Sequence, residues 1–61
     1  MKVREVRKAI EADGWTYQYT RGDHHHYKHP TKKGKVTIPG KDSDDLARKT
    51  AKSILKQAGL I

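Results

Sequence analysis

The sequence contains no cysteine and no phenylalanine, and its aromatic residues are one tryptophan and three tyrosines. The absence of cysteine excludes disulfides, thiolate zinc sites and cysteine nucleophiles. Because no long hydrophobic run is present, we expect neither a transmembrane span nor a signal peptide, and we predict a cytoplasmic protein. A length of 61 residues excludes two-domain enzymes and large cofactor-binding folds, so residues 1–61 are predicted to form one domain.

Acidic residues are scarce relative to basic ones. Seven Asp and Glu stand against 14 Lys and Arg, which gives a formal net charge of +7. Between residues 17 and 41 the only acid is Asp23, and all four histidines lie in the same stretch. The basic residues there are Arg21, Lys28, Lys32, Lys33, Lys35 and Lys41. This distribution indicates a surface that binds polyanions; a merely solvated basic surface and, less favoured, contact with an anionic membrane are the alternatives.

Hydrophobic spacing predicts a helix near the N-terminus. Val3, Val6 and Ile10 recur at intervals of three and four residues, which places them on one face of a helix over residues 2–13. Gly14 follows as a natural stop, because glycine readily adopts the left-handed conformation just past a helix end.

Alternation of side-chain types predicts three short strands, separated by turns rich in glycine and proline. The predicted strands span residues 15–20, 24–29 and 35–38. In the first of them, Trp15, Tyr17 and Tyr19 would share one face. Packing in the core and against the neighbouring strand is the favoured role of these rings, and stacking on nucleic-acid bases is the alternative.

The C-terminal segment predicts a second helix, which starts at Asp42 or Ser43 and ends before Gly59. Asp44 and Asp45 would occupy its first turn and lysines its last turn, as the helix macrodipole favours. The predicted apolar face comprises Leu46, Thr50, Ala51, Ile54, Leu55 and Ala58. The order α-β-β-β-α predicts an α+β fold with a three-stranded antiparallel sheet and both helices on one of its faces.

This order is that of double-stranded-RNA-binding domains, and four segments make the resemblance more specific. They are residues 13–15, 21–30, 36–39 and 52–60. With its Gly22-Asp23-His24 and His29-Pro30 motifs and its final Ile-Leu-Lys-Gln-Ala-Gly, the chain resembles HicA toxins of HicA–HicB toxin–antitoxin systems. The resemblance covers nearly the whole chain. Two positions depart from the family pattern, because Asp23 replaces the usual Ser or Gly, and Gly40 stands where a basic residue often follows.

The resemblance implies a double-stranded-RNA-binding-like fold and the role of toxin in a type II toxin–antitoxin system. It also implies an mRNA interferase, an endoribonuclease that cleaves messenger RNA and so inhibits translation. A HicB-like antitoxin is the implied protein partner, and messenger RNA is the implied substrate. The catalytic histidine of the family corresponds to His24.

The residues around His24 suit RNA cleavage without a metal ion. Such cleavage needs a base for the ribose 2′-hydroxyl, an acid for the leaving 5′-oxygen and cations for the developing phosphorane charge. Histidine serves the first two roles, and lysine or arginine the third. On a strand, His24, His26 and Lys28 share one face, opposite Tyr27. We therefore predict His24 as catalytic acid or base, and His26 and Lys28 as second catalytic or phosphate-contacting groups. The other predicted RNA contacts are Arg21, Lys32, Lys33 and Lys35.

Alternative interpretations of the histidines and of the whole chain stay open. His25 and His29 are predicted to be structural, with His29 fixing the turn before Pro30. Zinc or nickel binding by His24 and His26 is disfavoured, because Asp23 is the only nearby carboxylate, and we expect no metal or other cofactor. Two other functions compete with that of a nuclease: a non-catalytic RNA-binding module of the same fold, and a protein whose basic surface binds only an acidic partner.

Overall fold

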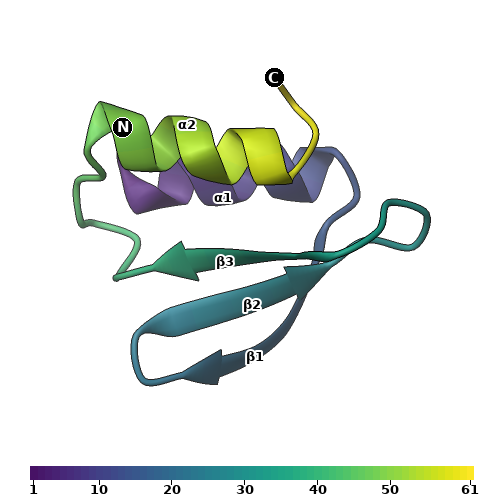
Figure 1. The fold of residues 1–61 in the computed structure, drawn as a ribbon. Coiled ribbons are helices and arrows are strands. Elements are labelled where there is room, and N and C mark those ends of the chain that lie inside the picture. Colours follow the sequence, from purple (N-terminus) through teal and green to yellow (C-terminus); the bar gives the residue numbers. More distant parts are fainter.

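The computed structural model describes all 61 residues and has the element order α-β-β-β-α (Figure 1). Helix α1 spans Val3–Ala12 and helix α2 spans Arg48–Gln57. Strands β1, β2 and β3 span Thr16–Arg21, His24–Lys28 and Lys35–Pro39. They form an antiparallel sheet in the order β1-β2-β3, which confirms the predicted α+β class and strand order. Neither helix has the length and apolarity needed to cross a membrane.

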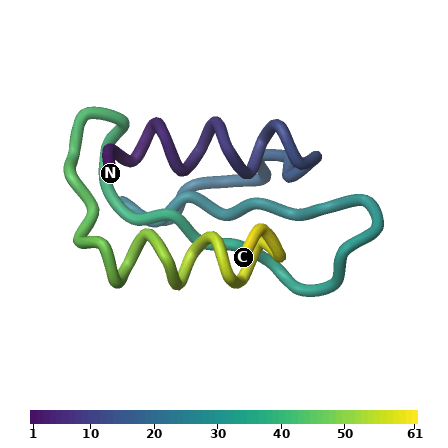
Figure 2. Tube along the Cα trace, turned by 90° about the horizontal axis from the view of Figure 1, so that it is seen from above, coloured from purple at the N-terminus to yellow at the C-terminus, as the bar shows by residue number.

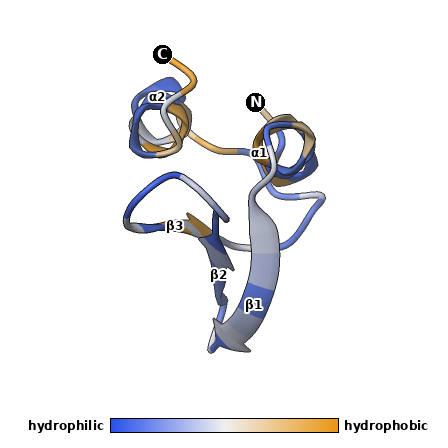
Figure 3. Ribbon diagram, turned by 90° about the vertical axis from the view of Figure 1, so that its right-hand side faces the viewer, coloured by the Kyte–Doolittle hydropathy of each residue, from blue (hydrophilic) through white to orange (hydrophobic).

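The two helices cover the sheet unevenly. They lie side by side and run in the same direction (Figures 1 and 2). Both helices contact β3, whereas β1 forms the opposite edge of the sheet. In the view along the helices, much of β1 and β2 extends away from them (Figure 3). Every residue of β1 is consequently exposed.

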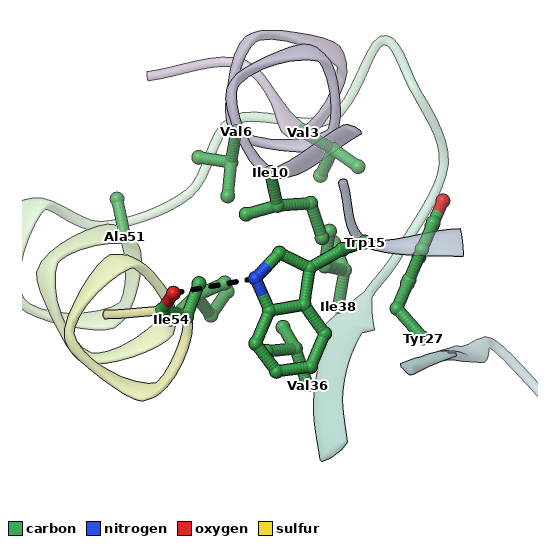
Figure 4. Close-up of a cluster of buried hydrophobic side chains, with 10 residues drawn as sticks. Val3, Val6, Ile10, Trp15, Tyr27, Val36, Ile38, Ala51 and Ile54 are labelled. Atoms are coloured by element: carbon green, nitrogen blue, oxygen red, sulfur yellow. Dashed lines mark hydrogen bonds between the residues drawn. The ribbon is translucent and has the colours of Figure 1, made fainter. Parts of the chain in front are cut away.

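Ten buried hydrophobic side chains form one core between the helices and the sheet (Figure 4). They are Val3, Val6, Ile10, Trp15, Tyr27, Val36, Ile38, Ala51, Ile54 and Ala58. Trp15 is the largest, and its indole N–H donates a 3.2 Å hydrogen bond to the carbonyl oxygen of Ala58. The apolar face of α1 and the alternating residues Val36 and Ile38 of β3 are therefore buried, as their spacing predicted.

Helix α2 begins several residues later than expected, and the predicted start at Asp42 or Ser43 is wrong. The segment before it runs past the first turn of α1 instead. The backbone N–H of Val3 donates a 2.9 Å hydrogen bond to the carbonyl oxygen of Asp44, and the carbonyl oxygen of Asp42 accepts a bond from the next N–H of α1. The first N–H groups of a helix lack partners within it, so this segment caps α1 with its backbone. Asp44 and Asp45 consequently lie outside α2.

Tyr17 and Tyr19 are 53% and 50% exposed, so the prediction that they pack in the core is wrong, although each does pack across to β2. The register between the strands shifts at this point, because Tyr17 pairs with Tyr27 whereas Tyr19 pairs with His26. Such a bulge breaks the two-residue alternation. It turns Tyr17 and Tyr19 to opposite faces of the sheet, and only Trp15 of the three aromatic residues is buried.

Candidate functional site

Strand β2 divides its side chains between two environments. Tyr27 is buried beneath the helices, at 3% exposure. Because alternate residues of a strand point to opposite sides, His24, His26 and Lys28 share the other side of the sheet. We call this side, with the residues paired to it on β1 and β3, the open face. The three residues predicted to act together are thus brought to one solvent-facing surface.

His24 lies at the first position of β2, with its side chain 57% exposed. Its Nδ1 atom is 3.4 Å from Oδ1 of Asp23. Arg21 of β1 stands opposite His24 in the antiparallel pairing of β1 with β2. The imidazole also lines a groove of about 470 Å³ between the open face and α2. The polar residues that share this groove, called the His24 groove below, are Thr37, Lys49, Thr50, Ser53 and Gln57.

The contribution of α2 to this groove was not predicted from the sequence. Thr50, assigned to the apolar face of the helix, is exposed and lines the groove. A signal for it was present, because Lys49, Ser53 and Gln57 recur every four residues and form a polar stripe along the helix. Lys49 also borders a second hollow with Lys52, so the exposed side of α2 is basic. That this stripe meets His24 depends on how α2 lies over the sheet.

His26 is held more tightly than His24. Its ring stacks on Tyr19 with centroids 4.5 Å apart and planes 22° apart, and its Nδ1 lies 3.2 Å from Oγ1 of Thr37. Partial burial lowers the pKa of His26 below its ordinary value of 6.5, and the positive charge of Lys35 lowers it further. The neutral imidazole, which can accept a proton, is therefore the favoured form at neutral pH.

His25 forms hydrogen bonds on the side of the sheet that carries the helices. Its Nε2 lies 2.7 Å from the carbonyl oxygen of Gly40, and its Nδ1 lies 2.8 Å from Oγ1 of Thr20. A carbonyl oxygen can only accept, so Nε2–H is the donor and Nδ1 accepts from the threonine hydroxyl. These contacts fix the ring between β1 and the end of β3, which agrees with the predicted structural role.

His29 fixes the loop between β2 and β3. Its Nε2–H donates a 2.7 Å hydrogen bond to the carbonyl oxygen of Asp13, while Nδ1 accepts the backbone N–H groups of Thr31 and Lys32 at 3.1 and 3.0 Å. The ring also packs edge-on against Trp15. The predicted structural role of His29 is confirmed, although the turn that its ring holds follows Pro30 and does not precede it.

The basic residues predicted to contact RNA fall into two groups. Arg21, Lys28, Lys33 and Lys35 are exposed, and none of their side chains forms an ion pair or hydrogen bond within the fold. Lys28 and Lys35 stand directly opposite each other on β2 and β3. Like charges in this position repel, and a bound anion would relieve the repulsion.

Lys32 differs from these residues because its ammonium group already has partners. It donates hydrogen bonds to the carboxylate of Asp13 and, at 3.0 Å, to the carbonyl oxygen of Ala58. The bond from Lys32 lowers the pKa of Asp13. Lys32 thus links the β2–β3 loop to the ends of both helices, and its ammonium group is engaged within the fold, unlike those of Lys28, Lys33 and Lys35.

No three side chains among histidine, aspartate and glutamate lie close enough together to hold a metal ion. His24 and Asp23 are neighbours, but no third group of this kind completes the set. The open face and the turn beside it present imidazole, ammonium, guanidinium and hydroxyl groups, together with the carboxylate of Asp23.

Comparison with known proteins gives one family match. The family described as HicA toxin of bacterial toxin-antitoxin systems matches residues 3–60, which include both helices, the whole sheet and every residue of the His24 groove. No curated protein sequence matches the chain.

Proposed function

The chain belongs to the HicA toxin family of bacterial toxin–antitoxin systems, and from this premise we propose that it is an endoribonuclease that cleaves messenger RNA and thereby inhibits translation. Its role as a toxin follows from the family. We further propose which reaction the protein catalyses and which residues perform it, and that residues 1–61 act as one toxin domain.

The position of His24 is the observation that carries the proposal. The imidazole is solvent-exposed, lines a groove and lies among polar groups of three elements. Arg21 beside it, and Lys49 across the groove, supply cationic donors. A group that transfers protons must reach its substrate, and a phosphodiester in this groove would lie between His24 and Lys49, with Arg21 on the β1 side of the histidine.

In the proposed reaction a base removes the proton from a ribose 2′-hydroxyl, and the 2′-oxygen attacks the adjacent phosphorus. The bond from phosphorus to the 5′-oxygen breaks, and an acid protonates that oxygen. The products are a 2′,3′-cyclic phosphate and a free 5′-hydroxyl. The proposal assigns one of the two proton transfers to His24.

His26 is the proposed second group of the reaction. It lies on the same face of β2 as His24, at the roughly 6.6 Å that separates alternate residues of a strand. Its lowered pKa favours the neutral form, which suits a base. Lys28 and Lys35 would contact the flanking phosphates. Since side chains supply acid, base and cations, the proposed reaction needs no metal ion.

Family membership also implies a HicB-type antitoxin as the protein partner. We propose that this partner presents an acidic surface to the open face. The net charge of +7 and the unpaired cations there would attract it, and the same residues would otherwise contact RNA phosphates. Inhibition would then result from direct exclusion of RNA from the His24 groove.

The proposed function is tested by incubating the purified protein with single-stranded RNA, and with DNA of the same sequence, in the presence of a chelator. Cleavage of RNA alone, with cyclic phosphate ends, is expected, because DNA lacks the attacking 2′-hydroxyl. Binding of RNA without cleavage would instead identify a non-catalytic RNA-binding module. Cleavage that requires a divalent ion would contradict the metal-free reaction.

A further inference from the structure

Tyr19 is one of the few large hydrophobic side chains that the fold leaves exposed, at 50%. The bulge in β1 turns it onto the open face, where its ring lies almost parallel to that of His26. One side of the tyrosine ring is thus supported by the imidazole, and the remainder faces solvent. We call this pair the Tyr19 platform.

Unpaired cations surround the platform. Tyr19 and His26 line a hollow of about 380 Å³ together with Lys28 and Lys35. These two lysines face each other across β2 and β3 and have no acidic partner in the fold. A flat aromatic ring beside two free ammonium groups matches a nucleotide, whose base can stack on the ring while its phosphates contact the cations.

We propose that the Tyr19 platform binds an unpaired base of the substrate, so that the protein acts on single-stranded RNA. This inference rests on the proposed function and specifies its substrate class. In a duplex both sides of each base are covered by its neighbours, and only an unpaired base can lie flat on a tyrosine ring. The fold resembles that of domains that bind double-stranded RNA, but those recognise the shape and backbone of the duplex and need no exposed ring.

The location of the platform fits a base next to the cleavage point. His26 and His24 are alternate residues of β2, so the platform lies roughly 6.6 Å along the strand from the proposed catalytic group. That distance is comparable to the span of one phosphate and its sugar. The stacked base would therefore belong to a nucleotide adjacent to the phosphate in the His24 groove, and stacking would hold that phosphate in place.

The chain offers a matched control for this proposal. Tyr17 and Tyr19 occupy the same strand and are exposed to nearly the same extent, at 53% and 50%, but they lie on opposite faces. Tyr17 packs edge-on against Tyr27, and its hydroxyl lies 2.6 Å from that of Thr20. Replacing either tyrosine removes a similar amount of aromatic surface, but only replacement of Tyr19 removes the platform.

The test measures RNA binding by fluorescence anisotropy in a His24→Ala background, which prevents cleavage during the measurement. The probes are an eight-nucleotide labelled single-stranded RNA and a duplex of the same length. Tyr19→Leu should weaken single-strand binding by about 5- to 160-fold, the range of stacking one base on an aromatic ring, and should leave duplex binding unchanged. Tyr17→Leu should change neither by more than about twofold, and Tyr19→Trp should retain single-strand binding.

Equal single-strand affinity of Tyr19→Leu and its His24→Ala parent would overturn the proposal. It would also be overturned if Tyr19→Leu lost as much affinity for the duplex as for the single strand, or if Tyr17→Leu lost as much single-strand affinity as Tyr19→Leu. If Tyr19→Leu does not fold, photo-crosslinking to 5-iodouridine RNA tests the protein with Tyr19 intact. A crosslink at Tyr19 is expected, and one at Tyr17, or none at either tyrosine, overturns the proposal. Failure of the unsubstituted protein to cleave RNA would overturn the proposed function only, since these binding measurements do not depend on cleavage.

Discussion

Arg7 of α1 holds Asp42, which lies between β3 and α2, through two hydrogen bonds from one guanidinium group. Its Nε and Nη2 atoms donate to the two carboxylate oxygens at 3.0 and 2.9 Å. Two parallel bonds fix the relative orientation of both groups better than a single contact does. The pair therefore fastens to α1 the segment that caps this helix and leads the chain into α2.

The Arg7–Asp42 pair predicts a dependence of stability on acid. The bond from Arg7 lowers the pKa of Asp42 below the ordinary value of 3.8. The folded state thus binds this proton more weakly than the unfolded state, so the stabilisation is present above pH 3.8 and is lost as the pH falls through the lowered pKa. Asp42→Asn should lower the melting temperature at neutral pH, as followed by circular dichroism. The difference in melting temperature between the variant and the unsubstituted protein should shrink as the pH falls below 3.8.

Asp45→Asn provides the control for this measurement. The Asp45 side chain is 76% exposed, and its ion pair with Lys2 lies at the surface, so its removal should cost little stability. Equal losses of melting temperature for the two variants at neutral pH would contradict a special role of the Arg7–Asp42 pair.

The neighbouring residues Lys32 and Lys33 should give opposite phenotypes. Lys32→Met removes contacts to Asp13 and Ala58, so it should lower the melting temperature and leave the salt dependence of RNA binding unchanged. Lys33→Met should leave the melting temperature unchanged. It should also reduce the log–log salt slope for single-stranded RNA by about 0.7, the value for one lost phosphate contact. Equal slopes for the two variants would contradict the assignment of a structural role to Lys32 and a phosphate contact to Lys33.

Lys49 should support catalysis from across the His24 groove. If its ammonium group contacts the reacting phosphate, Lys49→Met should lower kcat/KM for RNA by about 10- to 100-fold, as expected for a lost hydrogen bond to a charged group. Lys8 of α1 is exposed and lines no groove, so Lys8→Met should change kcat/KM by less than about twofold. Similar kcat/KM values for both variants would show that Lys49 of α2 does not contribute to catalysis.

The antitoxin should stabilise the toxin and compete with RNA. A partner that binds only the folded state at a hundredfold excess over its Kd raises the free energy of unfolding by about 2.7 kcal/mol. Lys33→Glu should weaken the binding of both RNA and antitoxin, as measured by titration calorimetry. Loss of RNA binding with unchanged antitoxin affinity would place the antitoxin on another surface.

Local patterns in the sequence predicted most of the fold. The spacing of Val3, Val6 and Ile10 gave the buried face of α1. Alternation along β2 placed Tyr27 in the core and His24 outside it. These predictions held because each depended only on the period of a regular element.

Features that depend on tertiary contacts were not predicted. Asp44 and Asp45 form a typical helix start, but the backbone of their segment is used to cap α1 instead. The bulge between Tyr17 and Tyr19 leaves no trace in the alternation of residue types. The polar stripe of α2 was visible in the sequence, whereas its approach to His24 follows from the packing of α2 over β3.

The cleavage rate of His24→Ala shows whether His24 transfers a proton during RNA cleavage. The side chain is exposed and belongs to no part of the core, so the variant should keep the circular dichroism spectrum of the unsubstituted protein. We predict that its rate on single-stranded RNA falls by about 10²- to 10⁴-fold, the contribution typical of a proton-transfer group. A folded His24→Ala protein that cleaves RNA at the unsubstituted rate would rule out proton transfer by His24.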